Sequence, residues 1–147
     1  MQIEATKIAP KDHRAWGRLA ESYRLMEEYE DLQRESYATA IRLAELMLEI
    51  NNRDWKTSAL LAIYYVHSDR EDDARALIES SLELAKRNAE ALLYASLVYI
   101  NLDEQETTLQ LLEEMVERDD SYRNYAGEDP DFQVLRGNDR YERLVNP

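Results

Sequence analysis

The sequence predicts an all-α protein, an α-solenoid in which antiparallel helix pairs stack side by side. The first observation is composition: the 147 residues include only three glycines and three prolines, whereas Ala, Leu, Glu and Arg, which favour helix, are abundant. The second is self-similarity, because the chain matches itself at a shift of 34 residues, a period typical of stacked helical repeats. The third is length, which suits one domain with a real core.

The internal repeat is clearest between the segments that begin at Trp55 and Ala89. Small residues return as small, and bulky residues mostly as bulky, 34 positions later. Leu61, Ala62, Tyr65, Ala74, Ile78, Ser81 and Leu82 return as Ala95, Ser96, Tyr99, Thr108, Leu112, Met115 and Val116. We therefore expect each unit to be a helix, a tight turn and a second helix.

Small residues are expected where the two helices of a unit cross, since the side chains between two backbones set how closely they approach. The predicted pairs are Ala20 with Ala40, Ala62 with Ala74, and Ser96 with Thr108. Their bulky neighbours would then form a continuous apolar layer rather than one central core.

The second helix of each later unit is predicted to begin at a capping box. Ser68 and Glu71 have the required spacing, and Asp103 with Glu106 repeats it.

The first unit carries the most recognisable motif. Trp16, Leu19, Ala20 and Tyr23 have the spacing W-x-x-L-[small]-x-x-Y. A 34-residue helical hairpin with this pattern resembles the tetratricopeptide repeat (TPR) family. The resemblance implies a TPR-like superhelix whose concave face, lined by the first helix of each pair, binds an extended peptide or a helix of another protein.

The first unit is also elongated. On the spacing of that family, Ala40 lies eight residues too far from Trp16, which corresponds to about two extra helical turns. We place them at residues 26–36, as longer helices that meet at a raised turn, because this stretch lacks Gly and Pro.

The repeat phase divides the chain into five segments. They are 1–12, the second helix of a truncated preceding repeat; 13–54, an elongated repeat 1; 55–88, repeat 2; 89–122, repeat 3; and 123–147, a C-terminal cap. Ala5 and Pro10 match the second-helix alanine and the terminating proline of the family. We therefore expect a piece of a larger bacterial protein, with an artificial start at Met1.

The C-terminal segment is predicted to form two short capping helices. Asp129 caps the first, which begins with Pro130 and closes at Gly137, and Asn138 caps a second that ends near Val145. The segment looks like the tail that often follows the last such repeat in bacterial signalling and regulatory proteins. It would cover the open apolar end of the stack.

The repeat phase, combined with the resemblance, identifies a groove lined by the first helices. Its predicted residues are Arg14, Glu21, Arg24, Lys56, Ala59, Ile63, His67, Glu90, Leu93, Leu97 and Asn101, together with Gly17. The Lys and Asn clamp with which co-chaperones of the family hold a C-terminal carboxylate is absent. We expect the groove to prefer an apolar strip, such as one face of an amphipathic helix, with basic residues at its acidic rim.

These features predict a non-enzymatic scaffold for protein-protein interaction, whose partner is another protein. An alternative stays open: the apolar floor is covered by the chain's own extra turns or by a second copy. The segment would then be an assembly element that pairs copies of the parent protein. Ile3 and Ile8, which lack the helix of a preceding repeat, would support a homodimer through the N-terminal helix.

Charge excludes two classes of partner. Eighteen Lys and Arg stand against thirty-one Asp and Glu, a net charge of −13, so nucleic acid and anionic membranes would be repelled. The acidic stretch 103–120 is interpreted as a solvated convex face. The absence of cysteine leaves cytoplasm and periplasm open, and of these we favour the cytoplasm.

The inventory for catalysis is thin. Neither His13 nor His67 belongs to a zinc motif or a phosphate loop, so no catalytic residue, metal or cofactor is predicted. His67 could bond a ligand backbone beside Asn101, or could satisfy the last carbonyls of its helix. The acids Asp129, Asp131 and Asp139 are interpreted as helix caps rather than calcium ligands.

Overall fold

The computed structural model describes residues 2–147, and for Gln2 only the backbone. Every element in this range is helical, and none of it is strand, so the all-α prediction is confirmed. The α-helices are α1 (Gln2–Ile8), α2 (His13–Arg24), α3 (Glu30–Ile50), α4 (Trp55–Val66), α5 (Glu71–Leu84), α6 (Ala89–Ile100), α7 (Gln105–Arg118), α8 (Arg123–Glu128) and α9 (Asp139–Val145). Two short 3-10 helices, η1 (Asp120–Tyr122) and η2 (Pro130–Leu135), complete the chain.

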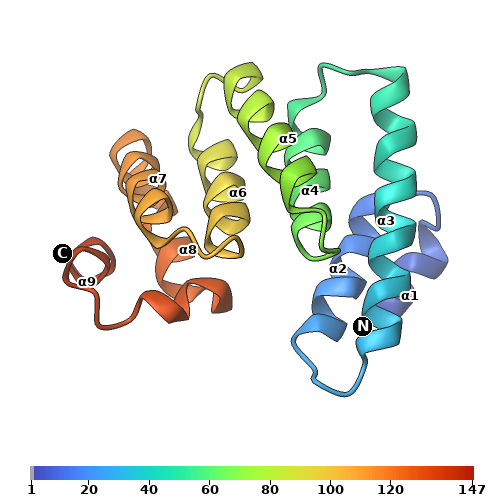
Figure 1. Cartoon of the computed structure of the whole chain (residues 1–147), viewed down its shortest axis with the longest axis horizontal. Helices are drawn as coiled ribbons and strands as arrows, with labels where there is room; N and C mark the ends of the chain where they lie inside the picture. The colour runs from blue at the N-terminus through green and yellow to red at the C-terminus, as the bar shows by residue number, and fades with distance from the viewer. Residues whose placement is uncertain (1) are drawn as a thin grey trace.

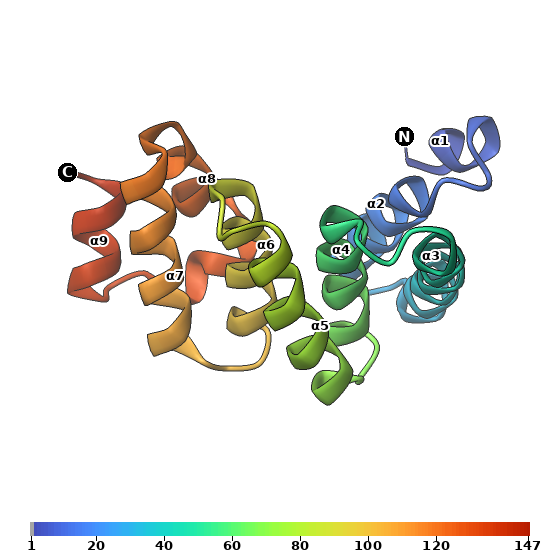
Figure 2. The same ribbon diagram turned by 90° about the horizontal axis from the view of Figure 1, so that it is seen from above.

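The long helices pack as adjacent pairs along the chain. Helix α2 packs on α3, α4 on α5, and α6 on α7, and successive pairs meet through α3 with α4, α5 with α6, and α4 with α6. Figure 1 shows the pairs side by side, and the two termini lie at opposite ends of the molecule in Figure 2. This order places the first helices of the three pairs in succession, which positions the candidate site.

The first helix of each pair begins at an acidic or amide side chain. Asp12, Asp54 and Asn88 each accept a hydrogen bond from a backbone amide in the first turn, at 2.9, 3.1 and 2.9 Å. Such caps satisfy amides that the helix itself leaves without a partner. The cap therefore recurs with the repeat.

The predicted capping boxes of the second helices are wrong. Neither α5 nor α7 has a side chain that bonds back at its start. Instead, Asp69 and Asp103 adopt left-handed backbone, each with a φ of 59°, just after α4 and α6. In the first of these turns the amide of Arg70 donates to the carbonyl of Tyr65 at 3.0 Å, a motif that closes the preceding helix. The predicted spacing therefore marks the end of the preceding helix and not the start of the next one.

The expected small residues lie buried between the paired helices. Each member of the three pairs is fully shielded from solvent: Ala20, Ala40, Ala62, Ala74, Ser96 and Thr108. Ser96 and Thr108 also bond their own helix, donating to carbonyls one turn earlier at 2.8 Å each. Buried residues from every pair join into one continuous apolar cluster along the stack.

The elongation of the first pair lies almost wholly in its second helix. Helix α2 has 12 residues, as do α4 and α6, whereas α3 has 21 residues against 14 in α5 and α7. The prediction that both helices lengthen is therefore wrong for α2. Glu, Arg, Leu and Gln extend either helix equally well, so composition could not assign the extra turns.

The C-terminal segment follows its predicted caps. Asp129 accepts the amide of Asp131 at the start of η2, Gly137 has a φ of 89°, and Asn138 caps α9. Helix α9 lies beside α7, and η2 packs on α6. The buried residues Phe132 and Tyr141 anchor these two pieces.

The acidic stretch of α7 does more than face solvent. Arg140 of α9 pairs with Glu106 and Glu113 at 2.8 and 2.5 Å, and Arg87 pairs with Glu114 at 2.5 Å. These acids therefore connect α7 to its neighbours on both sides.

The N-terminal helix α1 packs on α2. Trp16 stabilises this end, because its indole N–H donates to the carbonyl of Pro10 at 2.9 Å. Ile8 is 85% exposed, so α1 leaves apolar surface uncovered.

A pair of glycine substitutions tests the packing of α2 against α4. A Cβ on Gly17 would lie 2.6 Å from the ring of Tyr64, whose hydroxyl is held 2.9 Å from His13 Nδ1. We expect Gly17→Ala to lower the free energy of unfolding by about 1–3 kcal/mol, because the buried ring has no room to move. The measurement is denaturant unfolding.

Gly127→Ala is the matched control. Its Cβ would make ordinary contacts with Val145 at 3.6 Å, so the better helix propensity of alanine should raise stability by about 0.5–1 kcal/mol. An equal gain at both positions would contradict the packing described here.

Candidate functional site

A pocket of about 430 Å³ opens along the first helices α2, α4 and α6. Helix α3 contributes one tyrosine to it, and the C-terminal segment supplies two aspartates. The lining residues are Arg14, Gly17, Arg18, Glu21, Tyr37, Lys56, Leu60, Ile63, Tyr64, His67, Tyr94, Leu97, Asp129 and Asp131. Residues from α2, α3, α4, α6 and the C-terminal segment therefore meet at one hollow.

The pocket is apolar in the middle and charged at its ends. Leu60, Ile63 and Leu97 contribute aliphatic surface. The cations Arg14 and Lys56 come from the first turns of α2 and α4 and Arg18 from the middle of α2, whereas the carboxylates come from the last turn of α2 and from the C-terminal segment. Such a surface can hold an apolar side chain while its ends orient charged groups of a ligand.

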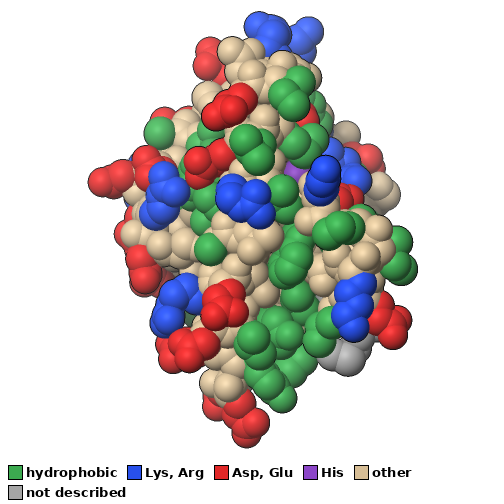
Figure 3. All heavy atoms as spheres, turned by 90° about the vertical axis from the view of Figure 1, so that its right-hand side faces the viewer, with side chains coloured by type: hydrophobic (Ala, Val, Ile, Leu, Met, Phe, Trp, Pro, Cys, Tyr) green, Lys and Arg blue, Asp and Glu red, His purple; other side chains and the backbone are tan. Residues whose placement is uncertain are grey.

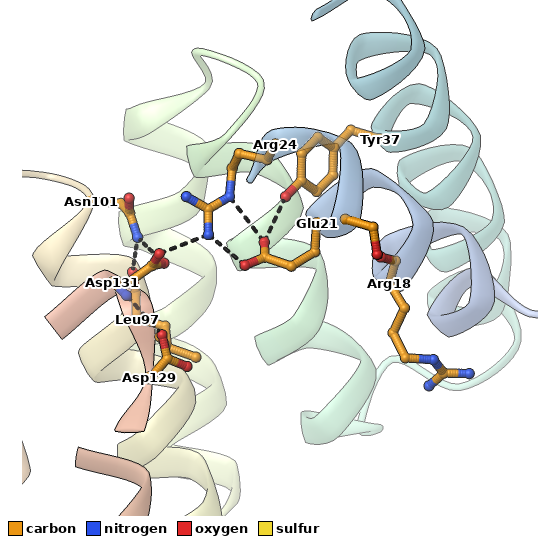
Figure 4. Close-up of polar contacts among 9 residues, drawn as sticks. Arg18, Glu21, Arg24, Tyr37, Leu97, Asn101, Asp129 and Asp131 are labelled. Carbon is orange, nitrogen blue, oxygen red and sulfur yellow. Dashed lines mark hydrogen bonds and ion pairs between the residues drawn. The ribbon is translucent and has the colours of Figure 1, made fainter. Parts of the chain in front are cut away.

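One cation of the pocket is free of an internal partner. Arg14 pairs with Asp12 at 3.1 Å, and Lys56 pairs with Glu90 at 2.8 Å. Arg18 forms no ion pair with any residue of 2–147, and in Figure 4 its guanidinium points away from the pocket carboxylates. It is therefore the lining cation best placed to meet an external anion.

A polar network closes the other end of the pocket (Figure 4). Asp131 of η2 accepts hydrogen bonds from Arg24 at 2.7 Å and from the side-chain amide of Asn101 at 2.9 Å. Arg24 also donates to Glu21 at 2.9 and 2.5 Å, and the hydroxyl of Tyr37 donates to Glu21 at 3.2 Å. The contact of Arg24 with Asp131 joins the first helix pair directly to the C-terminal segment; we call it the Arg24–Asp131 latch.

The latch is largely removed from solvent. The side chain of Arg24 is 18% exposed and that of Asp131 is 9% exposed. Burial alone would lower the pKa of Arg24, but its bonds to Glu21 and Asp131 outweigh this and raise it. Arg24 therefore keeps its charge at neutral pH, and its removal would leave the buried carboxylate of Asp131 without a counter-ion.

His67 lies against this network. Its ring stacks on that of Tyr37, with centroids 5.5 Å apart and planes inclined by 24°. Burial, and next the positive charge of Arg24, lower the pKa of His67 to about 4. The imidazole is therefore neutral at physiological pH and acts as a flat packing surface at the floor of the pocket.

The structure brings together part of the predicted groove. Seven of the predicted residues line the pocket: Arg14, Gly17, Glu21, Lys56, Ile63, His67 and Leu97. Arg24 and Asn101 hold Asp131 at its closed end, and Glu90 pairs with Lys56 at its edge. Leu93 is half-buried against the core and does not line the pocket.

The prediction for Ala59 is wrong. This residue is fully buried, so it lies under the surface and offers no contact to a ligand. The next residue, Leu60, lines the pocket instead, and its repeat equivalent Tyr94 does the same. The predicted face is therefore wrong at this one position: Lys56 and Ile63 of α4 line the pocket as expected, and Leu60, about 100° further round the helix, replaces Ala59.

Three groups of lining residues were not predicted from the sequence. Arg18, Leu60 and Tyr94 share one repeat position, so a second candidate phase would have found them. Tyr64 and Tyr37 gave no local signal, because a buried tyrosine in a helix is usually core. Asp131 was interpreted as a cap, which is wrong: its carboxylate binds Arg24, 107 positions away.

Two larger hollows lie between second helices. One, of about 620 Å³, lies where α3 meets α5, and the other, of about 550 Å³, where α5 meets α7. Nearly all the lining residues of the first recur 34 positions later in the second, for example Glu45 as Glu79 and Tyr65 as Tyr99. These two hollows therefore follow the repeat, whereas the pocket along the first helices also draws on the C-terminal segment.

No group of three or more His, Asp or Glu side chains is placed to hold a metal ion within residues 2–147. No helix of the described chain is both long and apolar enough to cross a membrane.

Comparison with known proteins gives no family. No model of a protein family matches the chain, and no curated protein matches it.

The latch yields a prediction on stability. Arg24→Ala should lower the free energy of unfolding by about 2–3 kcal/mol, because it removes charged hydrogen bonds and strands the buried carboxylate of Asp131. Arg34→Ala is the control: Arg34 pairs with Asp31 at 3.1 Å, but both side chains are solvated, so the loss should stay below about 0.5 kcal/mol. Similar losses by denaturant unfolding would argue against a buried latch.

His67 yields a prediction on pH. Its folded-state pKa of about 4 lies below the ordinary 6.5, so protonation favours the unfolded chain. The contribution of neutral His67 to the free energy of unfolding is complete above pH 6.5. It should decline by up to about 3 kcal/mol as the pH falls toward 4.

The variant His67→Phe keeps a flat ring against Tyr37 but cannot take up a proton. The free energy of unfolding of this variant should fall less steeply over the same pH range. His13 accounts for the pH dependence that remains, because burial also lowers its pKa. Urea unfolding at several pH values measures the difference. Identical pH profiles for wild type and variant would contradict this role of His67.

Proposed function

We propose that the protein is a non-enzymatic scaffold that binds a segment of another protein in the pocket along α2, α4 and α6. The observation that carries the proposal is how the pocket is made. It has an aliphatic floor, the cation Arg18, unpaired within the described chain, at one end, and carboxylates held by the Arg24–Asp131 latch at the other. The repeated helix pairs support a TPR-like solenoid, whose first helices form a binding face. Residue types suited to recognition meet there, whereas no nucleophile is paired with a base among the lining residues.

The size of the pocket favours a short extended segment over a whole helix. About 430 Å³ falls in the range of ligand pockets and holds only a few side chains. The latch shortens the groove further, because it joins α2 to η2 across one end. A peptide can lay an apolar side chain on Leu60 and Leu97 without opening this contact.

Charge sets the preferred sequence of the peptide. Arg18 has no internal counter-ion and favours an acidic group near the apolar anchor. The closed end carries Asp129, whose pKa is raised by burial, and the latched Asp131. We therefore propose an anchor residue that is flanked by an acid on the side of Arg18.

A second candidate is an assembly element that pairs copies of the parent protein. The exposure of Ile8 on α1 favours it, because a partner copy would cover this side chain. Sedimentation separates the two functions. A protein that stays monomeric at high concentration supports the scaffold, and a dimer that Ile8→Glu dissociates supports assembly.

Peptide display tests the scaffold. Peptides selected on the wild type should bind the double variant Leu60→Glu, Leu97→Glu at least about tenfold more weakly, because a carboxylate on the floor would be desolvated by the anchor. Arg18→Glu should weaken acidic peptides in particular, and circular dichroism verifies that each variant is folded.

The matched control is Val134→Glu. Val134 is an exposed apolar residue of η2 that does not line the pocket, so this variant should bind like the wild type. The proposal fails if no selected peptide distinguishes the pocket variant from this control.

A further inference from the structure

The turn between α2 and α3 presents an apolar surface. Leu25, Met26, Tyr29 and Leu32, which we call the turn patch, are each between 41% and 53% exposed. Figure 3 shows hydrophobic side chains gathered over the lower part of its face, at the end of the molecule where Figure 1 places this turn. Four large apolar residues exposed within eight positions exceed the scattered exposure usual on a soluble surface.

The corresponding turns of the later pairs lack this feature. Residues 67–70 between α4 and α5, and residues 101–104 between α6 and α7, have no large exposed hydrophobic side chain. They are formed mainly by polar and charged residues. The patch therefore belongs to the elongated pair alone, and the stacking of helices does not require it.

The turn patch is held in a fixed shape. The amide of Leu25 donates to Glu21 at 3.1 Å, that of Met26 to Tyr23 at 3.0 Å, and that of Tyr29 to Met26 at 3.3 Å. The rings of Tyr23 and Tyr29 pack with centroids 5.5 Å apart. Tyr29 and Leu32, three residues apart, share one side of the start of α3. A surface fixed before binding loses little entropy when a partner docks.

Charge around the patch selects the occupant. Residues 25–35 contain five acids, Glu27, Glu28, Glu30, Asp31 and Glu35, and a single cation. That cation, Arg34, already pairs with Asp31. A second copy of this chain would bring two such acidic rims together, which disfavours self-association. A basic partner would bind more tightly, because the same acidic residues attract its cations.

We propose that the turn patch binds a basic amphipathic helix of another protein, with its apolar face on Leu25, Met26, Tyr29 and Leu32 and its cations toward the acidic rim. This site is separate from the pocket along α2, α4 and α6. It does not depend on the function proposed for that pocket. The chain would then present two docking surfaces of opposite charge preference.

The test uses a synthetic amphipathic helix with leucine on one face and lysine on the other. Calorimetry should show binding to the wild type that weakens as salt rises, since the rim charges are solvated. A counterpart peptide with glutamate in place of each lysine should not bind. The double variant Leu25→Ser, Leu32→Ser should weaken binding at least about tenfold without changing the net charge.

The matched control is Leu46→Ser with Val134→Ser. Both positions are exposed and apolar, and Leu46 lies on the same helix α3, so equal affinity to wild type is expected. The pocket variant Leu60→Glu, Leu97→Glu should also retain the peptide, which separates this site from the other.

Three results would overturn the proposal. Equal losses in the patch and control variants would show attraction to the acidic protein as a whole. Equal binding of the glutamate peptide would remove the role of charge. A dimer of the wild type that Leu25→Ser, Leu32→Ser dissociates would show that a second copy occupies the patch.

Discussion

The close approach of paired helices at alanine-sized residues is the constraint on which this structure depends. Ala62 and Ala74 are fully buried where α4 meets α5, and the serine and threonine at the equivalent positions of the next pair bond their own helices rather than each other. Each pair packs on the next one along the chain, through α3 with α4, α5 with α6, and α4 with α6. The candidate pocket exists because of this order.

Polar contacts determine what the stack leaves open. The carboxylate of Asp131 accepts hydrogen bonds from Arg24 and Asn101, and these contacts occupy one end of the face formed by the first helices. Lys56 and Glu90 satisfy each other at the edge. Two surfaces remain accessible. One is the aliphatic floor of the pocket, with Arg18 beside it, and the other is the turn patch between α2 and α3 with its acidic rim. The two surfaces proposed for recognition are thus the ones that internal contacts leave accessible.

Properties that repeat were predictable from the sequence, and properties that occur once were not. The period of 34 residues located the all-helical pairs and the small crossing residues, because each of these signals occurs more than once. The choice between Ala59 and Leu60 depends on a rotation of about 100°, which the sequence leaves undetermined because α4 is apolar nearly all round and has no polar face to set its orientation. Asp103 was misjudged because left-handed turns and capping boxes share acidic residues. The pairing of Asp131 with Arg24 has no local signature, since it joins segments 107 positions apart.

The latch also bears on how the molecule opens. In a linear array of repeats, either end can fray while the rest stays folded, because each unit contacts only its neighbours. Here, detachment of η2 removes one of the two carboxylates that Arg24 pairs with, and loss of the first pair leaves Asp131 without its guanidinium. The latch joins residues 107 positions apart, so fraying at either side of it costs an interaction that a purely nearest-neighbour array lacks.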